Sequence, residues 1–198
     1  MNGKHVDSMK EFPEVGELVV GTVTNVTDYG AYIALDEYGG IEGLLHISEI
    51  SSSWVKNIND FVREGEKLVL KVLRVDKEKR HIDLSLRRVS KREKQEKMVE
   101  WKKKKKSESI LEVVGQKLGL EPTQFTSQVM SILEEKFGTA YTGLEEFVER
   151  GEELADRLKI PREWARAIVE VAQQKIKPSR VKIKSILQLT TTDPNGIE

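Results

Sequence analysis

Two tyrosines around a glycine are the first residues in this sequence whose types and spacing suggest a chemistry. In the stretch DYGAY, residues 28–32, Gly30 permits a tight bend between Tyr29 and Tyr32. If both rings lie on one outer face, nucleobases can stack on them, each stack contributing roughly 1 to 3 kcal/mol. In the alternative, the rings fill the interior of a barrel, and the pair alone does not decide between the two.

A ring nitrogen and several cations further along the chain favour an outer surface that binds nucleic acid. His46 ends a strand-like run, Arg74 lies in the next run, and Lys79 and Arg80 occupy the turn that follows. A closed barrel could gather a ring donor and cations for phosphates beside the tyrosines. No metal site is predicted, because the chain has 3 histidines and no carboxylate cluster with ligand spacing.

Five short runs rich in Val, Ile and Leu must position these side chains. They are ELVVGTVTNV, GAYIAL, IEGLLHI, KLVLKVLRVD and HIDLSLR, and glycine and aspartate breaks separate them. The segment SEISSSWVKNINDFVREGE is too long and too polar for a hairpin, which predicts a mobile loop with a short helical piece at 58–62. Residues 11–87 are therefore predicted to form a five-stranded OB-fold β-barrel.

Helical periodicity replaces this pattern at 88–176 and predicts a separate α-helical domain. Ser90 is a candidate N-cap for the first helix, and Gly138, Pro161 and Pro178 mark later helix boundaries. The first helix carries six candidate core residues, which are Met98, Trp101, Ile110, Leu111, Val114 and Leu118.

The segment 177–198 does not resemble the end of a domain. Its alternating apolar and polar residues predict a half-buried strand, and DPNG then predicts a turn toward another element. Because a lone strand is not stable, we expect a linker and the first strand of a truncated C-terminal α/β domain. Pairing with the helical domain is the alternative. Residues 1–10 are expected to be a disordered start or a tag.

Charge is concentrated in one part of the chain. The 33 basic and 33 acidic residues cancel, but residues 87–106 hold 11 Lys or Arg against 3 Glu. Lys102, Lys103, Lys104 and Lys105 could contact RNA phosphates there, or simply form a solvated helix face. Without cysteine, a membrane-spanning run of roughly 20 apolar residues or a signal peptide, the chain is expected to be soluble and cytoplasmic.

Two long stretches, GTVTNVTDYGAYIALDEYGGIEGLLHISEIS and VLRVDKEKRHIDLSLRRVS, resemble the S-one RNA-binding domain. From about residue 11 onward, FPEVGELVVGTV, SEISSSWVKNI, EWKKKKK and GQKLGL resemble the alpha subunits of archaeal and eukaryotic translation initiation factor two. The first resemblance implies five RNA-facing positions, which are Tyr29, Tyr32, His46, Asp76 and Arg80.

The second resemblance implies a non-catalytic, RNA-binding subunit of a heterotrimeric, GTP-dependent factor that brings initiator methionyl-tRNA to the small ribosomal subunit. The partners it implies are initiator tRNA, mRNA or rRNA on that ribosomal subunit, and a gamma subunit bound through the third domain. The chain has no G-x-x-x-x-G-K-[ST] loop, so no cofactor is expected.

The same resemblance places Ser51 at the regulatory serine of the eukaryotic relatives, with Ser48 nearby. A phosphate there would add about −1.5 to −2 charge and three acceptor oxygens near Lys56. The chain has SSW where those relatives have arginines, and KRHID at 79–83 where they have Lys-Gly-Tyr-Ile-Asp. We therefore expect an archaeal-type subunit without the eukaryotic control; a merely hydrated loop is the alternative.

Two other classes of function are compatible with a barrel of this kind. An accessory module of an RNA-processing or degradation complex predicts a carboxylate cluster for metal, or a coupled nucleophile and base, and the sequence has neither pattern. A purely structural adaptor would make Tyr29, Tyr32 and Arg80 incidental, so that their substitution leaves RNA binding untouched.

Overall fold

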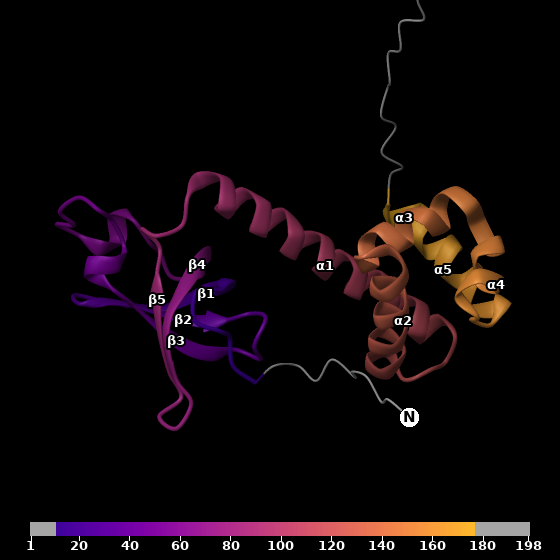
Figure 1. Ribbon diagram of the computed structural model, residues 1–198, viewed down its shortest axis with the longest axis horizontal. Coiled ribbons are helices and arrows are strands. Elements are labelled where there is room, and N and C mark those ends of the chain that lie inside the picture. Colours follow the sequence, from indigo (N-terminus) through magenta and orange to yellow (C-terminus); the bar gives the residue numbers. More distant parts are fainter. Residues whose placement is uncertain (1–10, 177–198) are drawn as a thin grey trace, which may run out of the picture.

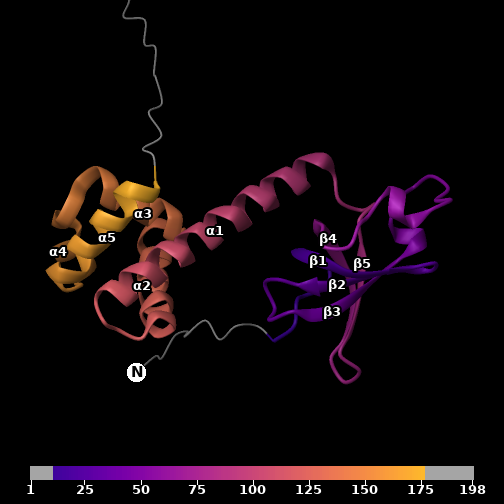
Figure 2. The ribbon, with the colours of Figure 1, turned by 180° about the vertical axis from the view of Figure 1, so that it is seen from behind.

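The computed structural model describes residues 11–176, which form a β-barrel and a helical part joined by one long helix (Figure 1). The view from behind shows the same division (Figure 2). The strand expected within 177–198 and the disordered start expected at 1–10 lie outside the described residues.

The barrel consists of β1 (Leu18–Thr27), β2 (Gly30–Leu35), β3 (Ile41–His46), β4 (Lys67–Asp76) and β5 (His81–Ser85). The strands follow the order β1-β2-β3-β5-β4 around a closed barrel. All neighbouring pairs are antiparallel except β3 and β5. The structure thus confirms the predicted five-stranded OB-fold barrel.

Closure of the barrel depends on the parallel contact between β3 and β5. Leu44 lies opposite Asp83 across this contact. Gly43 permits the close approach, because a Cβ atom at this position would come within 2.6 Å of Leu84 Cδ1 and 3.2 Å of Ile82 O. The interior is filled by fully buried apolar side chains, including Val19, Ile33, Leu35, Leu45, Leu70 and Ile82.

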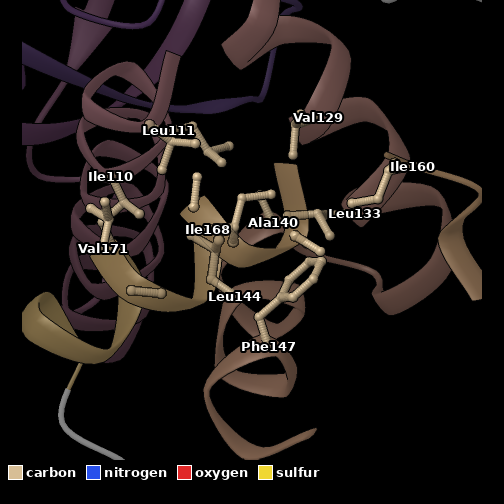
Figure 3. Close-up of a cluster of buried hydrophobic side chains, with 14 of the residues drawn as sticks. Ile110, Leu111, Val129, Leu133, Ala140, Leu144, Phe147, Ile160, Ile168 and Val171 are labelled. Carbon is tan, nitrogen blue, oxygen red and sulfur yellow. The ribbon is translucent and has the colours of Figure 1, made fainter. Parts of the chain in front are cut away.

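The helical part is built from α1 (Lys91–Lys117), α2 (Pro122–Phe137), α3 (Ala140–Arg150), α4 (Leu154–Leu158) and α5 (Arg162–Lys175). Ser90 caps α1, as predicted: its Oγ accepts from the Glu93 N–H at 3.2 Å, and the Glu93 carboxylate accepts from the Ser90 N–H at 2.8 Å. This reciprocal pair is a capping box. One apolar cluster holds the helices together (Figure 3), with Ile110, Leu111, Leu133, Leu144, Phe147 and Ile168 fully buried.

Helix α1 contributes to both parts of the molecule. Near its start, Met98 and Trp101 pack against Val20, Val69 and Val89 of the barrel side. Its second half enters the core of the helical part instead. The six core residues predicted on this helix are therefore divided between two cores, since a helix of 27 residues spans roughly 40 Å.

Polar contacts reinforce the junction between α1 and the barrel. Lys97 Nζ lies 3.0 Å from Glu37 Oε1, and both side chains are mostly buried. Lys67 Nζ lies 2.7 Å from Asp36 Oδ2 and 5.0 Å from the centroid of the Trp101 ring. A cation over an indole face adds electrostatic attraction to the apolar packing.

The long segment after β3 contains two short 3-10 turns, Ile47–Glu49 and Ile58–Asp60. The second confirms the helical piece predicted at 58–62. Ile50, Ile58 and Val62 are buried, so apolar contacts hold the segment against the barrel.

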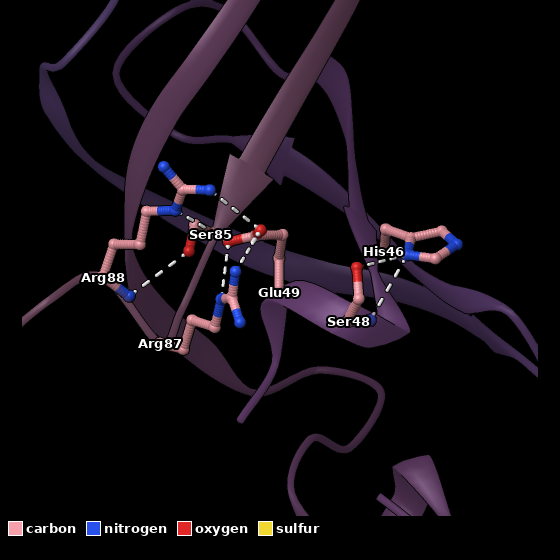
Figure 4. Close-up of polar contacts among 6 residues, drawn as sticks. All are labelled: His46, Ser48, Glu49, Ser85, Arg87 and Arg88. Carbon is pink, nitrogen blue, oxygen red and sulfur yellow. Dashed lines mark hydrogen bonds and ion pairs between the residues drawn. The ribbon is translucent and has the colours of Figure 1, made fainter. Parts of the chain in front are cut away.

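Glu49 anchors this segment to the end of β5 (Figure 4). Its carboxylate accepts two hydrogen bonds each from Arg87 and Arg88, at 3.0 to 3.2 Å. Partial burial by itself would raise the pKa of this carboxyl group, but hydrogen bonds from Arg88, Ser85 and Arg87 outweigh it and lower the pKa to about 2.

Substitution of Gly43 should destabilise the contact between β3 and β5 that closes the barrel. We expect Gly43→Ala to lower the free energy of unfolding by about 1 to 3 kcal/mol, because the new methyl group overpacks the contact with β5. Glu42→Ala, at the exposed neighbouring position, is the control and should change it by less than about 0.5 kcal/mol. Urea denaturation read from NMR signals of barrel residues measures both; equal values for the two variants would contradict the account.

The Glu49 anchor should depend on pH. The pKa of Glu49 is lowered in the folded protein from its ordinary 4.5 to about 2, so its stabilising contribution is complete above about pH 4.5 and lost as the pH falls toward 2. We expect Glu49→Gln to lower the free energy of unfolding by about 1 to 2 kcal/mol at neutral pH, a value discounted for the exposure of the arginines. The difference in the free energy of unfolding between this variant and the unsubstituted protein, measured by urea denaturation, should shrink below pH 4.5. A difference that does not change with pH would show that the ionised carboxylate of Glu49 is not its cause.

Candidate nucleic-acid interface

One row of side chains crosses four strands on the outside of the barrel. In register, Tyr32 of β2 lies opposite Leu44 of β3, Leu44 opposite Asp83 of β5, and Asp83 opposite Arg74 of β4. Directly opposed residues share a face, and the neighbouring Ile33 is fully buried, so this row faces outward. We call these four residues the outer row.

Tyr29 and Tyr32 lie together at one end of the outer face. Their ring centroids are 6.4 Å apart with the planes at 88°, and their hydroxyl oxygens are 2.7 Å apart. The hydrogen bond to Tyr29, and then burial and the nearby Glu42 carboxylate, raise the pKa of Tyr32. Two neutral rings at right angles offer aromatic faces in two directions rather than one continuous platform.

His46 lies beside these tyrosines. The Ile47 N–H donates to the Tyr29 carbonyl at 2.8 Å, which brings the end of β3 next to the β1–β2 turn. His46 Nδ1 accepts from the Ser48 N–H at 3.3 Å and lies 2.8 Å from Ser48 Oγ (Figure 4). A neutral ring in this arrangement carries its proton on Nε2, which is directed away from Ser48 and can donate to a ligand.

Two residues of this face were not among the predicted binding residues. His81 Nε2 lies 3.2 Å from Asp83 Oδ1, and Asp83 stands between His81 and Arg74 on the outer face. The alternation in HIDLSLR could have identified both as outward-facing. What it could not indicate is that β5 pairs with β3, which brings Asp83 into line with Tyr32.

The predicted cluster of Lys79 and Arg80 beside the tyrosines is wrong. Because β5 runs parallel to β3, the turn before β5 lies at the end of the barrel where β3 begins, whereas His46 is the last residue of β3. The length of β5, roughly 15 Å, separates the two ends. In this turn Asp76 Oδ1 accepts from the Lys79 N–H at 3.0 Å.

Arg80 in this turn has a left-handed backbone, with φ of 51°, and its guanidinium lies 3.8 Å from Glu11 Oε1. Both side chains of this pair are mostly exposed, so the contact is weak and can be exchanged for another anion. The outer face is thus elongated, with the tyrosines and His46 at one end and Arg80 at the other.

The lysine run lies on α1, away from the outer row. Its lysines are exposed in the middle of the helix. The part before them packs on the barrel, and the part after them enters the core of the helical part. Lys103 and Lys106 lie 5.2 Å and 5.8 Å from the centroid of the Tyr141 ring, and Lys105 pairs with Glu108 at 2.8 Å. Lys102 and Lys104 are exposed on the same segment.

The two serines considered for phosphorylation have different surroundings. Ser48 is exposed and bonded to His46, whereas Ser51 is half-buried. Ser51 Oγ accepts from the Ser53 N–H at 3.1 Å and lies 2.9 Å from Ser53 Oγ. The serines therefore take part in local hydrogen bonds that shape the loop.

Within residues 11–176, no group of three or more His, Asp or Glu side chains is arranged to hold a metal ion. None of the helices in this part of the chain is long and apolar enough to cross a membrane.

Comparisons with known proteins agree with this geometry. Residues 13–87 match the S1 RNA binding domain family, and residues 125–198 match the family described as Eukaryotic translation initiation factor 2 alpha subunit. The translation initiation factor 2 subunit alpha of Methanopyrus kandleri is 41% identical over 191 residues, covering 96% of this chain and 72% of that protein. Its counterpart in Thermococcus onnurineus is 43% identical, with 96% and 68% covered.

Solved structures give the same relationship. The intact alpha subunit of aIF2 from Pyrococcus abyssi has a TM-score of 0.74 and 38% identity, covering 94% of this chain and 71% of that one. A chain in the a/eIF2alpha-aDim2p-rRNA complex from Pyrococcus horikoshii OT3 has a TM-score of 0.68 and 41% identity, covering 84% and 99%. The chain has an S1-type barrel followed by this helical part, and it is similar to these proteins along nearly its whole length. The protein therefore belongs to the family of archaeal translation initiation factor 2 alpha subunits.

Proposed function

We propose that this chain is the RNA-binding, non-catalytic subunit of a heterotrimeric, GTP-dependent initiation factor that brings initiator methionyl-tRNA to the small ribosomal subunit. The observation that carries the proposal is the outside of an S1-type barrel, where Tyr29, Tyr32 and His46 lie together and Arg74 stands at the far end of the outer row. The family to which the chain belongs supports initiation rather than RNA processing.

On this proposal, RNA binds along the outer face without strong sequence preference. Bases stack on Tyr29 and Tyr32, and His46 Nε2 donates a hydrogen bond to a base or phosphate. Arg74, exposed at the far end of the outer row, contacts a phosphate. A longer strand that follows β5 reaches Arg80, with Asp76 and Lys79 shaping the turn that presents it.

The remaining partners are proposed because relatives of this family support them. Lys102 to Lys105 extend the basic surface along α1, so that a folded RNA such as tRNA or rRNA contacts both parts of the molecule. We propose, from the family alone, that a gamma subunit supplies GTP hydrolysis and binds the C-terminal α/β domain of the factor. Ser48 is the better placed of the two serines for modification, because it is exposed and next to His46.

Substitutions in the outer row should weaken RNA binding. We expect Tyr32→Ala to reduce the affinity for single-stranded RNA by about 1 to 3 kcal/mol through loss of one stack. Arg74→Ala should instead reduce the slope of log affinity against log salt by about 0.7, the value for one phosphate contact on a single strand. Fluorescence anisotropy with a labelled RNA of about 12 nucleotides, at several salt concentrations, measures both effects.

Arg162→Ala is the matched control, since Arg162 is an exposed arginine of the helical part that pairs with Asp156. It should leave the affinity and the salt slope unchanged. Equal effects of Arg74→Ala and Arg162→Ala, or normal binding by Tyr32→Ala, would rule out the outer face as the RNA site.

The lysine run should matter only for RNA that extends beyond the barrel. We expect the double substitution Lys102→Gln and Lys104→Gln to lower the salt slope for initiator tRNA by about 0.7 to 0.9 per lysine, because each removes a phosphate contact. Binding of the RNA of about 12 nucleotides to the barrel should be unaffected. An unchanged salt slope for initiator tRNA in this double variant would assign the lysines to a solvated helix face.

A further inference from the structure

Trp54 is exposed to solvent to a degree that folding does not explain. Its exposed fraction is 92%, against 49% for Tyr29. The other two tryptophans are packed: Trp101 lies under Lys67, and Trp164 meets Phe125 with ring centroids 5.0 Å apart. A large aromatic ring left in water contributes no packing and is a typical anchor for a ligand.

The loop that carries Trp54 has a fixed base. Glu49 binds two arginines on the near side, and Ile50 and Ile58 are buried on either side of the tip. Asn57 caps the second 3-10 turn, its Oδ1 accepting from the Asn59 N–H at 3.1 Å. The indole is therefore presented from a positioned loop rather than from a free end of the chain.

This loop starts at the end of the barrel where the tyrosines lie. His46 caps the first 3-10 turn, and the backbone of Ile47 is bonded to Tyr29. Trp54 is the fifth residue after Glu49, so its Cα atom lies within roughly 18 Å of the Cα atom of that anchor. One OB fold covers roughly 4 to 16 nucleotides, so a strand bound at Tyr29 is long enough to reach the loop.

The neighbours of Trp54 suit a base with its phosphate. The segment ISSSWVKNIN at 50–59 contains one lysine and no carboxylate. Ser52, Ser53, Lys56 and Asn57 are exposed within three residues of Trp54 in sequence and offer hydroxyl, ammonium and amide donors. Of the two acids that flank this segment, Glu49 is paired with arginines and Asp60 lies six residues beyond Trp54, so an aromatic residue with a nearby cation and neutral donors fits a polyanion whose bases stack.

We propose that Trp54 is a further stacking site for a base of single-stranded RNA, which extends the binding surface from the outer face of the barrel onto the loop after β3. Lys56 supplies the phosphate contact of this site. The inference rests on the proposed function, because it needs RNA to be held first at the tyrosines.

The test uses the whole chain labelled with 5-fluorotryptophan, in which each of the three tryptophans gives one fluorine NMR signal. Trp54→Phe identifies the signal of Trp54. Addition of a single-stranded RNA of about 12 nucleotides should shift or broaden that signal and leave those of Trp101 and Trp164 in place.

Affinities from anisotropy complete the test. Trp54→Leu, which keeps an apolar side chain without a ring, should weaken binding roughly 5- to 150-fold, the range expected for one lost stack. Trp54→Phe should retain most of the affinity. Because the side chain is 92% exposed, neither substitution should alter folding, which circular dichroism checks.

RNA binding with an unchanged Trp54 signal, or with equal affinity of Trp54→Leu and the unsubstituted chain, overturns the Trp54 site while the proposed function stands. Absence of RNA binding by the unsubstituted chain at low salt overturns the proposed function, and the Trp54 site with it. A shift of all three signals together would indicate a general conformational change and also overturn the site.

Discussion

The parallel contact between β3 and β5 is the constraint on which the rest of the structure depends. It closes the barrel, and it aligns Tyr32, Leu44, Asp83 and Arg74 across four strands. The same contact brings the end of β5 beside the segment after β3, where Arg87 and Arg88 bind Glu49. The contact places Asp83 and Arg74 in line with Tyr32, whereas the pairing of β2 with β3 already brings the tyrosines and His46 together.

Helix α1 connects the barrel to the helical part. Its capping box begins the helix five residues after β5, and its first turns pack on the barrel through Met98 and Trp101. Because the same unbroken helix then enters the second core, the lysine run is placed between two folded bodies. The molecule is thus suited to contact an RNA that is longer than the barrel.

Local patterns were enough to predict the barrel, the helical part, the Ser90 cap and the short helical turn after β3, because each depends on residues close in sequence. The composition of the candidate site was partly predictable as well, since the tyrosines and His46 do lie together. The misplaced cluster of Lys79 and Arg80 has a physical cause: strand alternation fixes which face a residue occupies, but not which strand lies beside it. The division of one helix between two cores was hidden for a similar reason: helical periodicity shows which face of the helix is buried, but not which part of the molecule packs against it.

The most direct test of this account is NMR with nitrogen-15-labelled protein and a single-stranded RNA of about 12 nucleotides. The account predicts that backbone signals change along β2, β3, β5 and the end of β4, around the outer row, and that the fully buried core of the helical part is unaffected. Changes confined to the helical part, or no changes at low salt, would contradict the claim that the outer row of the barrel is the RNA-binding surface.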